Sequence, residues 1–445
     1  MLKFKIGHYV ERPGKELGSS PVTIPVPEDL ETVPGIPQRP SEVDWYTKEY
    51  PLESHNVENR AYRQWVDTVT DIRGLRMEHE KLNRDSVIAA RASGDLEPTA
   101  KPVEGMDVTL NIKTKARELG FGEVGITEFD LRYVFAAKRD WVKSELPHAV
   151  CVIMEQGYED TQSAPSGPAE AAALDCYRRE GVAAVELASF IRGLGYRAQI
   201  HSPNDASCAA IPMMVAAGLG QLGANGQLLS PYFGSRARIM MITTDAVLTH
   251  DEPIDYGIHA WCQVCQVCVN RCPGRALMKD KIWWRGVEKN KLIAKRCRPV
   301  MGHYAACGVC QKVCPIQKYG MKAVFEHYSQ TGEVMGKGTD DLEGYTIPGM
   351  GYFGPGQLPT FNADFFDIPQ GRLEEYVVGQ LRDRIKVGGQ EEDPEKLAQT
   401  YGRQIVRAVG RPADFMEELY FAPEAEGALP SRGYFQDEPE FEEDL

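Results

Sequence analysis

Cysteines with a regular spacing are the residues of this sequence best suited to chemistry. The first group, Cys262, Cys265, Cys268 and Cys272, follows the pattern C-x2-C-x2-C-x3-C-P. The second group also ends in proline and consists of Cys297, Cys307, Cys310 and Cys314. A four-iron, four-sulfur (4Fe-4S) cube takes one thiolate per iron, and this spacing gives three thiolates to one cube and the fourth to its neighbour. The sequence therefore predicts a bacterial-type two-cluster ferredoxin-like iron-sulfur domain.

The crossover between the motifs predicts which thiolates share a cluster. One cluster is expected on Cys262, Cys265, Cys268 and Cys314, and the other on Cys272, Cys297, Cys307 and Cys310. The long interval between Cys297 and Cys307 predicts a bulging loop, which is a candidate wall for a substrate or cofactor. Zinc ligands usually come as two pairs without a trailing proline, and a chain of 445 residues does not need a disulfide framework. The three other cysteines, Cys151, Cys176 and Cys208, are predicted to be small buried apolar residues.

Composition excludes some classes of partner. The net charge of -14 disfavours a nucleic-acid ligand, which needs a basic surface. The sequence has no stretch of membrane-spanning length, and its N-terminus has neither the apolar core of a signal peptide nor paired arginines. We therefore expect a cytoplasmic protein without an integral membrane segment. A mature exported protein that has lost its leader would have the same features.

Hydrophobic periodicity predicts helices and strands in alternation. A charged helical pattern covers about residues 59–92, a longer helix about 169–191, and a short helix 212–217. Strands are expected at 122–127, 149–154, 196–201 and 239–243. Strands that alternate with helices indicate an α/β or α+β core layered with helices.

Changes in composition divide the chain into four segments. Many prolines before Leu52 predict an extended arm, and the glycine-, proline- and aromatic-rich stretch beyond Met335 predicts irregular wrapping. The expected segments are an N-terminal arm with helices (1–110), an α/β core (111–250), the iron-sulfur domain (251–330), and a C-terminal wrapping segment with an acidic tail (331–445).

A glycine-rich segment, AAGLGQLGANGQLLSPYFGSRARIMMITTD, lies directly before the cysteines at residues 216–245. Its G-x-G-x-x-G spacing suggests a dinucleotide-binding turn, but a helix precedes the glycines and the sequence leaves no room for a helix after them. The segment resembles the corrinoid-dependent reductive dehalogenases. The resemblance implies a nitroreductase-like core that binds base-off cobalamin; the implied cofactor-binding residues are Gly218, Gly220, Gly223, Asn225, Gly226 and Phe233. Small residues allow the close backbone approach that a flat macrocycle with amide arms needs.

A second stretch, residues 175–206, is similar to the part of that family that carries the catalytic tyrosine. The resemblance assigns Tyr177 as the proton donor and Arg238 as the cation held against it. Phenol is a weak acid at neutral pH, so a permanently charged guanidinium that stabilises the phenolate suits this role. Asn204 corresponds to a pocket asparagine of some family members.

The resemblance implies a reductive dehalogenase that replaces a carbon-bound halogen by hydrogen. Cob(I)alamin engages the halogen, two 4Fe-4S clusters deliver electrons, and Tyr177 supplies the proton. The family's base-off binding needs no histidine ligand, and the sequence contains no D-x-H-x-x-G motif. Without an export signal the chain is more similar to family members that act on haloaromatics or halophenols than to those that act on chloroalkenes. An external low-potential donor of ferredoxin or flavodoxin type is expected, and the sequence does not predict the oligomeric state.

Two rival functions remain open from the sequence. Epoxyqueuosine reductase shares cobalamin and two clusters, but it acts on transfer RNA and normally has an apolar residue at the position of Arg238. A non-catalytic electron carrier would need far less chain outside the cysteine motifs. Bound corrinoid distinguishes the carrier from both enzymes.

Overall fold

The computed structural model describes residues 72–134, 138–284, 287–292, 294–361 and 363–366. The proline-rich arm and the acidic tail expected from the sequence lie outside the described residues. The four-segment division of the chain therefore stays a prediction.

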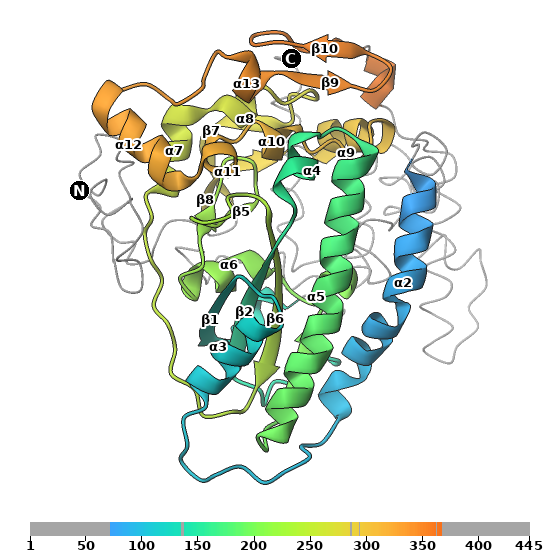
Figure 1. Ribbon diagram of the computed structural model, residues 1–445, viewed down its shortest axis with the longest axis vertical. Coiled ribbons are helices and arrows are strands. Elements are labelled where there is room, and N and C mark those ends of the chain that lie inside the picture. Colours follow the sequence, from blue (N-terminus) through green and yellow to red (C-terminus); the bar gives the residue numbers. More distant parts are fainter. Residues whose placement is uncertain (1–71, 135–137, 285–286, 293, 362, 367–445) are drawn as a thin grey trace, which may run out of the picture.

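A four-stranded sheet forms the centre of the fold (Figure 1). Its strand order is β1-β2-β6-β3, with β1 at Glu123–Glu128, β2 at His148–Glu155, β6 at Ala237–Thr244 and β3 at Ala198–His201. All neighbouring strands are antiparallel. The four predicted strands are confirmed within a few residues. Antiparallel pairing favours the α+β alternative over a parallel α/β sheet.

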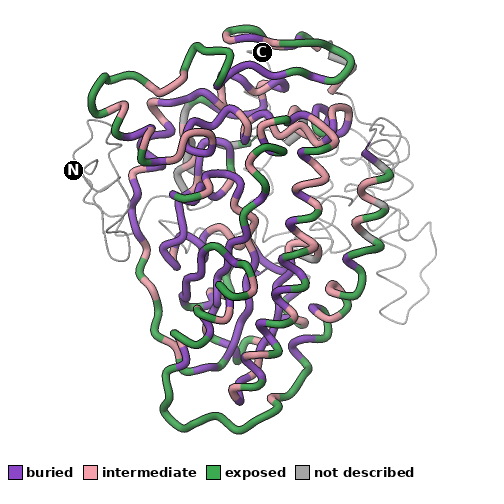
Figure 2. The backbone as a smooth tube through the Cα atoms, in the orientation of Figure 1, coloured by how far each residue is buried: buried purple, intermediate pink, exposed green. Residues whose placement is uncertain are grey.

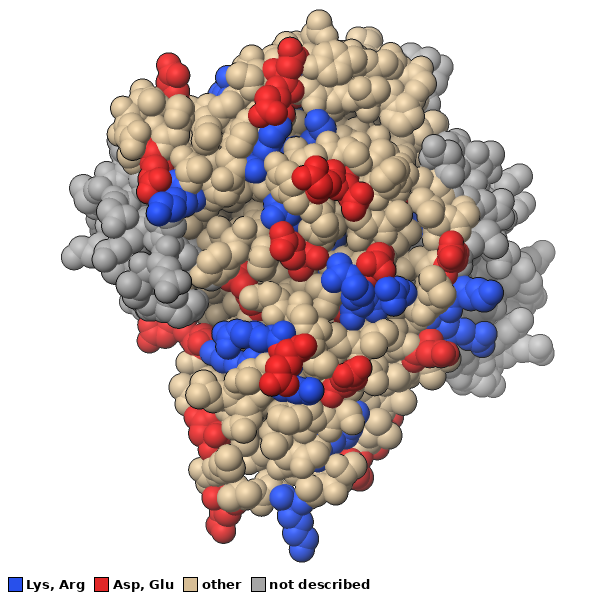
Figure 3. Space-filling model, viewed as in Figure 1, with Lys and Arg blue, Asp and Glu red and all other residues tan. Residues whose placement is uncertain are grey.

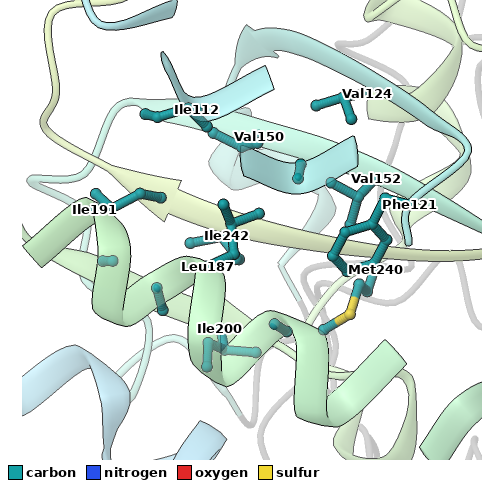
Figure 4. Close-up of a cluster of buried hydrophobic side chains, with 14 of the residues drawn as sticks. Ile112, Phe121, Val124, Val150, Val152, Leu187, Ile191, Ile200, Met240 and Ile242 are labelled. Carbon is teal, nitrogen blue, oxygen red and sulfur yellow. The ribbon is translucent and has the colours of Figure 1, made fainter. Parts of the chain in front are cut away.

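Helices α3 (Thr109–Glu118) and α5 (Gly167–Gly193) cover one face of this sheet. Ser166 caps α5 by accepting a hydrogen bond from the Ala169 backbone N–H, and a proline occupies its first turn. Leu187 and Ile191 of α5 pack against β2 and β6, where Val152 is fully buried (Figure 4). This packing holds α5 firmly along the sheet.

Helix α2 (Arg73–Ala92) lies beside α5 and also contacts the edge strand β3 (Figure 1). Arg76 and Glu170 form an ion pair at 3.4 Å near the start of both helices. A Cβ atom at Gly181 of α5 would lie only 2.9 Å from Ser86 Oγ of α2, so glycine allows the two helices to approach closely. The predicted helix over residues 59–92 is thus confirmed for its described part.

The second face of the sheet is covered by α6 (Ala210–Ala216) and by the segments around it, so the strands are buried on both sides (Figure 2). After α6 comes a hairpin of two short strands, β4 (Gln221–Leu222) and β5 (Leu228–Leu229). A helix therefore precedes the glycines and a hairpin follows them, as the rejection of a dinucleotide-binding turn requires.

Short helices and the turns beside them carry the cysteines, and these helices pack with two hairpins at one end of the sheet (Figure 1). Their bounds are α7 Ile258–Cys265, α8 Val267–Asn270, β7 Leu277–Trp284, β8 Val287–Leu292, α9 Ala294–His303, α10 Val309–Lys312, α11 Pro315–Tyr319, α12 Met321–Thr331, α13 Asp340–Glu343, β9 Tyr345–Ile347 and β10 Gly351–Phe353. No helix in the described part of the chain is long and apolar enough to cross a membrane.

Two local predictions for this region were wrong. The loop expected between Cys297 and Cys307 is mostly helix, because α9 continues to His303 before the chain turns through positive φ angles at Ala305 and Ala306. The irregular segment expected beyond Met335 contains α13 and the β9-β10 hairpin. Arg271, which is buried, donates from Nη1 to the Gln357 carbonyl at 2.5 Å and from Nη2 to the Phe353 carbonyl at 3.0 Å. These buried contacts order a segment whose local sequence has little helix or strand preference.

Candidate functional site

The predicted pair Tyr177 and Arg238 is in contact at the sheet end nearest the cysteines. Tyr177 lies on α5 and Arg238 is the second residue of β6, and both side chains are half-buried. Arg238 Nη1 donates a hydrogen bond to the Tyr177 hydroxyl at 3.3 Å, and the guanidinium carbon lies 5.1 Å from the centre of the phenol ring. A guanidinium in this position can stabilise negative charge on the phenol oxygen.

Gln156 holds the guanidinium in place, a role that the sequence did not reveal. Its side-chain oxygen accepts hydrogen bonds from Arg238 Nε at 2.9 Å and from Nη2. Gln156 is buried, and its backbone N–H donates to the Arg236 carbonyl at 2.9 Å. It follows β2 directly, where that strand pairs with the start of β6. Because Nε and Nη2 of Arg238 both donate to the Gln156 oxygen, Nη1 remains to donate to the phenol of Tyr177.

Glu180 is a second residue that sequence reasoning missed. It lies one helical turn after Tyr177, its side chain is 0% exposed, and neither carboxyl oxygen has a hydrogen-bond partner among the described residues. Burial raises the pKa of Glu180 to about 8, against the opposing charges of Arg238 and Arg179. The sequence contains one indication of this burial, because the carboxyl of Glu180 directly precedes the run of small apolar residues GVAAV.

Asn204 lies in a short 3-10 turn, Pro203–Asp205, that follows β3. Strand β3 is antiparallel to β6, with His201 opposite Met241, so the chain beyond β3 runs toward the Arg238 end of β6. Asn204 Oδ1 lies 3.2 Å from Nε2 of His79 on α2, and this nitrogen donates in the tautomer that protonates it. Asn204 Nδ2 is buried without a partner in the described part of the chain, which leaves a free donor. The contribution of α2 through His79 was not predicted.

The predicted glycine-rich turn forms the β4-β5 hairpin, and most of its glycines are required by the protein's own packing. A Cβ atom at Gly220 would lie 2.4 Å from the Leu229 carbonyl oxygen, and Gly218 and Gly223 would make similar clashes with protein atoms. Gly226 differs, since its φ of 74° needs glycine while the space around it is open. Of the four glycines, Gly226 therefore offers the clearest access for a ligand.

The same hairpin joins the sheet to the first group of cysteines. The Ala224 backbone N–H donates to the Cys262 sulfur. Asn225 is buried, and its Nδ2 has no partner among the described residues. Phe233 lies farther along and packs over Gly122, where a Cβ atom would be 2.6 Å from the ring. The unpaired amide of Asn225 fits a ligand with hydrogen-bonding amide arms.

Most of the charge interactions among the eight cysteine thiols lie within two sets, and Cys310 also interacts with Cys268 and Cys314 of the other set. Burial raises the pKa of Cys262 to about 12, with a further contribution from Cys314. Burial also raises the pKa of Cys297 to about 12, and here the next contribution comes from Cys272. The interacting thiols of the first set are Cys262, Cys265, Cys268 and Cys314, and those of the second are Cys272, Cys297, Cys307 and Cys310. The ligand sets expected from the crossover rule stay a prediction.

No group of three or more His, Cys, Asp or Glu side chains in the described residues is arranged to hold a metal ion. A cube differs from a single ion because each of its four thiolates binds a different iron, so the sulfurs surround a larger body. Four buried thiols with backbone N–H donors around them, such as Ala224 at Cys262, have the chemistry that such a cube needs.

Arg236 connects the sheet to the end of the second cysteine motif. Its Nη2 forms an ion pair with Glu155 at 2.7 Å, and its Nη1 donates to the Gln317 carbonyl at 2.6 Å. Burial raises the pKa of Cys314 to about 11, and the positive charge of Arg236 opposes this rise. The Tyr177 site and the first cysteine set are therefore parts of one continuous packed structure.

Searches of known proteins support an enzyme related to dehalogenases. No family model matches the sequence. The tetrachloroethene reductive dehalogenase of Desulfitobacterium hafniense is 36% identical over 145 residues, which are 32% of this chain and 26% of that relative. The enzyme of the same name from Sulfurospirillum multivorans is 33% identical over 174 residues, or 36% of this chain and 33% of the relative. An epoxyqueuosine reductase of Lactococcus garvieae is 32% identical over 119 residues, 24% of this chain and 32% of that protein.

Solved structures include a similar fold. The catabolic reductive dehalogenase NpRdhA matches with a TM-score of 0.50 and 27% identity, over 56% of this chain and 38% of that one. NpRdhA in complex with 3-bromo-4-hydroxybenzoic acid matches with a TM-score of 0.55 and 21% identity, over 77% of this chain and 53% of that one.

The relatives and the solved structures with a similar fold include several reductive dehalogenases. The predicted resemblance of this chain to that family is confirmed. The aligned segments span between a quarter and a third of the dehalogenase relatives.

Proposed function

We propose that this protein is a corrinoid-dependent reductive dehalogenase that replaces a carbon-bound halogen by hydrogen in an organohalide. The contact between the Tyr177 hydroxyl and Arg238 carries the proposal, because it joins a proton donor to a cation that stabilises the donor's conjugate base. The relatives named as dehalogenases support the same reaction.

Each residue of the pair has a separate role in the proposed reaction. Tyr177 gives its hydroxyl proton to the carbon that loses the halogen, and the developing phenolate is stabilised by Arg238. Gln156 prevents the guanidinium from turning away, since it occupies two of its other N–H groups. A bound corrinoid supplies the reduced cobalt centre that engages the halogen.

The residues around the hairpin fit a corrinoid. We propose that Gly218, Gly220, Gly223, Gly226, Asn225 and Phe233 form part of its pocket. Asn225 offers an unpaired buried amide, and Gly226 allows close approach. We propose that the two cysteine sets hold 4Fe-4S clusters that receive electrons from an external low-potential donor.

The substrate class is an organohalide, and a halophenol preference stays our prediction. The dehalogenase relatives are named for tetrachloroethene, so a chloroalkene must be tested as a substrate beside a halophenol. Asn204 offers its free amide nitrogen as a donor to the substrate.

Reconstitution with cobalamin under anaerobic conditions tests the proposal. We expect about one cobalt per eight iron, which two cubes and one corrinoid require, and halide release from a dihalophenol or tetrachloroethene. A protein that binds iron but takes up no corrinoid would instead be a non-catalytic electron carrier. Corrinoid uptake with reduction of an epoxyqueuosine-containing RNA stem-loop, and no halide release, would favour the epoxyqueuosine reductase. On the face shown in Figure 3, basic and acidic side chains are interspersed, which does not favour an RNA ligand there.

A further inference from the structure

Glu180 is a buried carboxyl in the proposed active site whose role the dehalogenase mechanism does not explain. It lies three residues after Tyr177 on α5, and side chains at this spacing lie on the same face of a helix. Both side chains interact with Arg238, Tyr177 by a hydrogen bond and Glu180 by charge. Both acids therefore interact with the same guanidinium group, that of Arg238.

Arg238 has only neutral hydrogen-bond partners, Gln156 and Tyr177, among the described residues. The charged and titratable groups that act on Glu180 are Arg238 from β6, and Arg179 and Cys176 from α5 itself. An ionised Glu180 would therefore be the anion that compensates this half-buried cation.

Among the described side chains near Glu180, those of the other neighbouring elements add no second charge. Near Gly181, α2 presents the uncharged side chains of Asn83 and Ser86. Its His79 contacts Asn204, and His201 of β3 is bonded to Ser207 and Thr243. An apolar side chain at position 180 would fill this volume without the cost of burying an unpaired carboxyl.

We propose that Glu180 is a proton-relay residue that restores the proton of Tyr177 after each dehalogenation. This inference rests on the proposed function. Glu180 is then the second acid of the site, and it holds a proton that it transfers to the Tyr177 phenolate.

The proton and charge balance of this step is complete. The substrate carbon loses halide, receives two electrons from the external donor through the clusters, and receives the Tyr177 proton. The phenolate oxygen then takes the proton of the Glu180 carboxylic acid, as one O–H bond breaks and another forms. The Glu180 carboxylate that remains is reprotonated from solvent. Arg238 interacts with the phenolate before the transfer and, through charge, with the Glu180 carboxylate after it, so the guanidinium is compensated throughout.

The resting state of Glu180 supports this order of events. Because burial raises its pKa to about 8, the carboxyl carries its proton at neutral pH and loses it only in alkaline solution. The relay should therefore work at neutral pH and fail as pH rises through about 8.

The first test is spectroscopic and needs no substrate. Infrared spectra of the full-length protein at pH 7 should contain the carbonyl stretching band of a protonated carboxylic acid. The band should be lost above pH 8 and be missing in Glu180→Gln. The control is Glu186→Gln, which changes an exposed glutamate of the same helix. A spectrum at pH 7 in which Glu180→Gln removes no such band would overturn the proposal.

The second test is the pH profile of halide release by protein loaded with cobalamin. We expect wild type and Glu186→Gln to lose activity as pH rises through about 8. Glu180→Gln should be slower by about a hundredfold in kcat at pH 7, with KM unchanged and without the alkaline decline. Glu180→Asp, which keeps a carboxyl, should recover part of the rate.

These results separate the two proposals. Active wild type with an unchanged rate and pH profile in Glu180→Gln would overturn the relay and leave the dehalogenase proposal intact. A corrinoid-loaded wild type that releases no halide would overturn both.

Discussion

Replacing Glu180 by glutamine should change how folding stability depends on pH. The carboxyl has a pKa of about 8 in the folded protein against 4.5 for an ordinary glutamate, because burial penalises its charge. A group whose pKa is raised on folding stabilises the folded state fully below the lower value. That contribution is lost as pH rises through the higher one. Glutamine does not titrate, so it removes the dependence.

The size of the effect follows from the shift. Between the two pKa values, each pH unit removes about 1.4 kcal/mol of folding free energy from wild type relative to the variant. From pH 5 to pH 7 the accumulated difference should be about 2 to 3 kcal/mol. Glutamine still buries a polar amide, but that cost is the same at every pH and cancels in the comparison.

Denaturant unfolding of the full-length protein under anaerobic conditions measures this difference. Wild type, Glu180→Gln and Glu186→Gln are compared at pH 5, 6 and 7, and unfolding free energies are derived from the transition midpoints. The advantage of Glu180→Gln over wild type should grow steadily with pH, while Glu186→Gln should follow wild type. Parallel pH dependences in wild type and Glu180→Gln would refute the reasoning, since they would mean that Glu180 titrates normally.

Three further substitutions test other contacts of the site. Gln156→Leu frees the guanidinium of Arg238, and should lower kcat for halide release about tenfold to a hundredfold with little change in KM; an unchanged kcat would mean that the hydrogen bonds to Gln156 are not needed. His79→Ala removes the contact to Asn204, and we expect KM to rise several-fold while kcat changes less; equal effects on both would argue against a binding role. Cys268→Ala removes a ligand from one cube, so bound iron should fall from about eight to about four per chain by metal analysis; retention of all the iron would contradict the assigned ligand set.

Local patterns were sufficient to predict the central elements of the fold. Helix α5 was predicted within about two residues at each end, because its apolar residues recur at helical spacing. The four sheet strands were predicted in the same way. The strand order and antiparallel directions depend on long-range pairing, so the sequence left the α+β and α/β alternatives open.

The site was predicted only where the resemblance named a residue. Tyr177 and Arg238 were predicted from motifs and are in contact. Gln156 and Glu180 matter through contacts between elements far apart in the sequence. A glutamine after a strand and a glutamate inside a helix are ordinary in a sequence. Their roles become visible only when β2, β6 and α5 are packed together.

The cysteine region shows the same limit. The spacing predicts how the eight thiols divide between two clusters, because it encodes which sulfurs cross between them, and this division stays a prediction. The chain between Cys297 and Cys307 was expected to be a bulging loop, because the interval between these cysteines is long. Pro299 lies inside α9, past its first turn, so the local sequence did not favour the helix that the structure contains.

Halide release by the corrinoid-loaded protein and by its Tyr177→Phe variant tests the central claim most directly. Both proteins should bind the same cobalt and iron, and wild type should release one halide for each hydrogenated product. The variant, which lacks the phenolic proton, should be slower by about a hundredfold or more. Loaded wild type that releases no halide from either a halophenol or tetrachloroethene would contradict the assignment as a dehalogenase. Equal rates in wild type and Tyr177→Phe would contradict the role of Tyr177 as the proton donor.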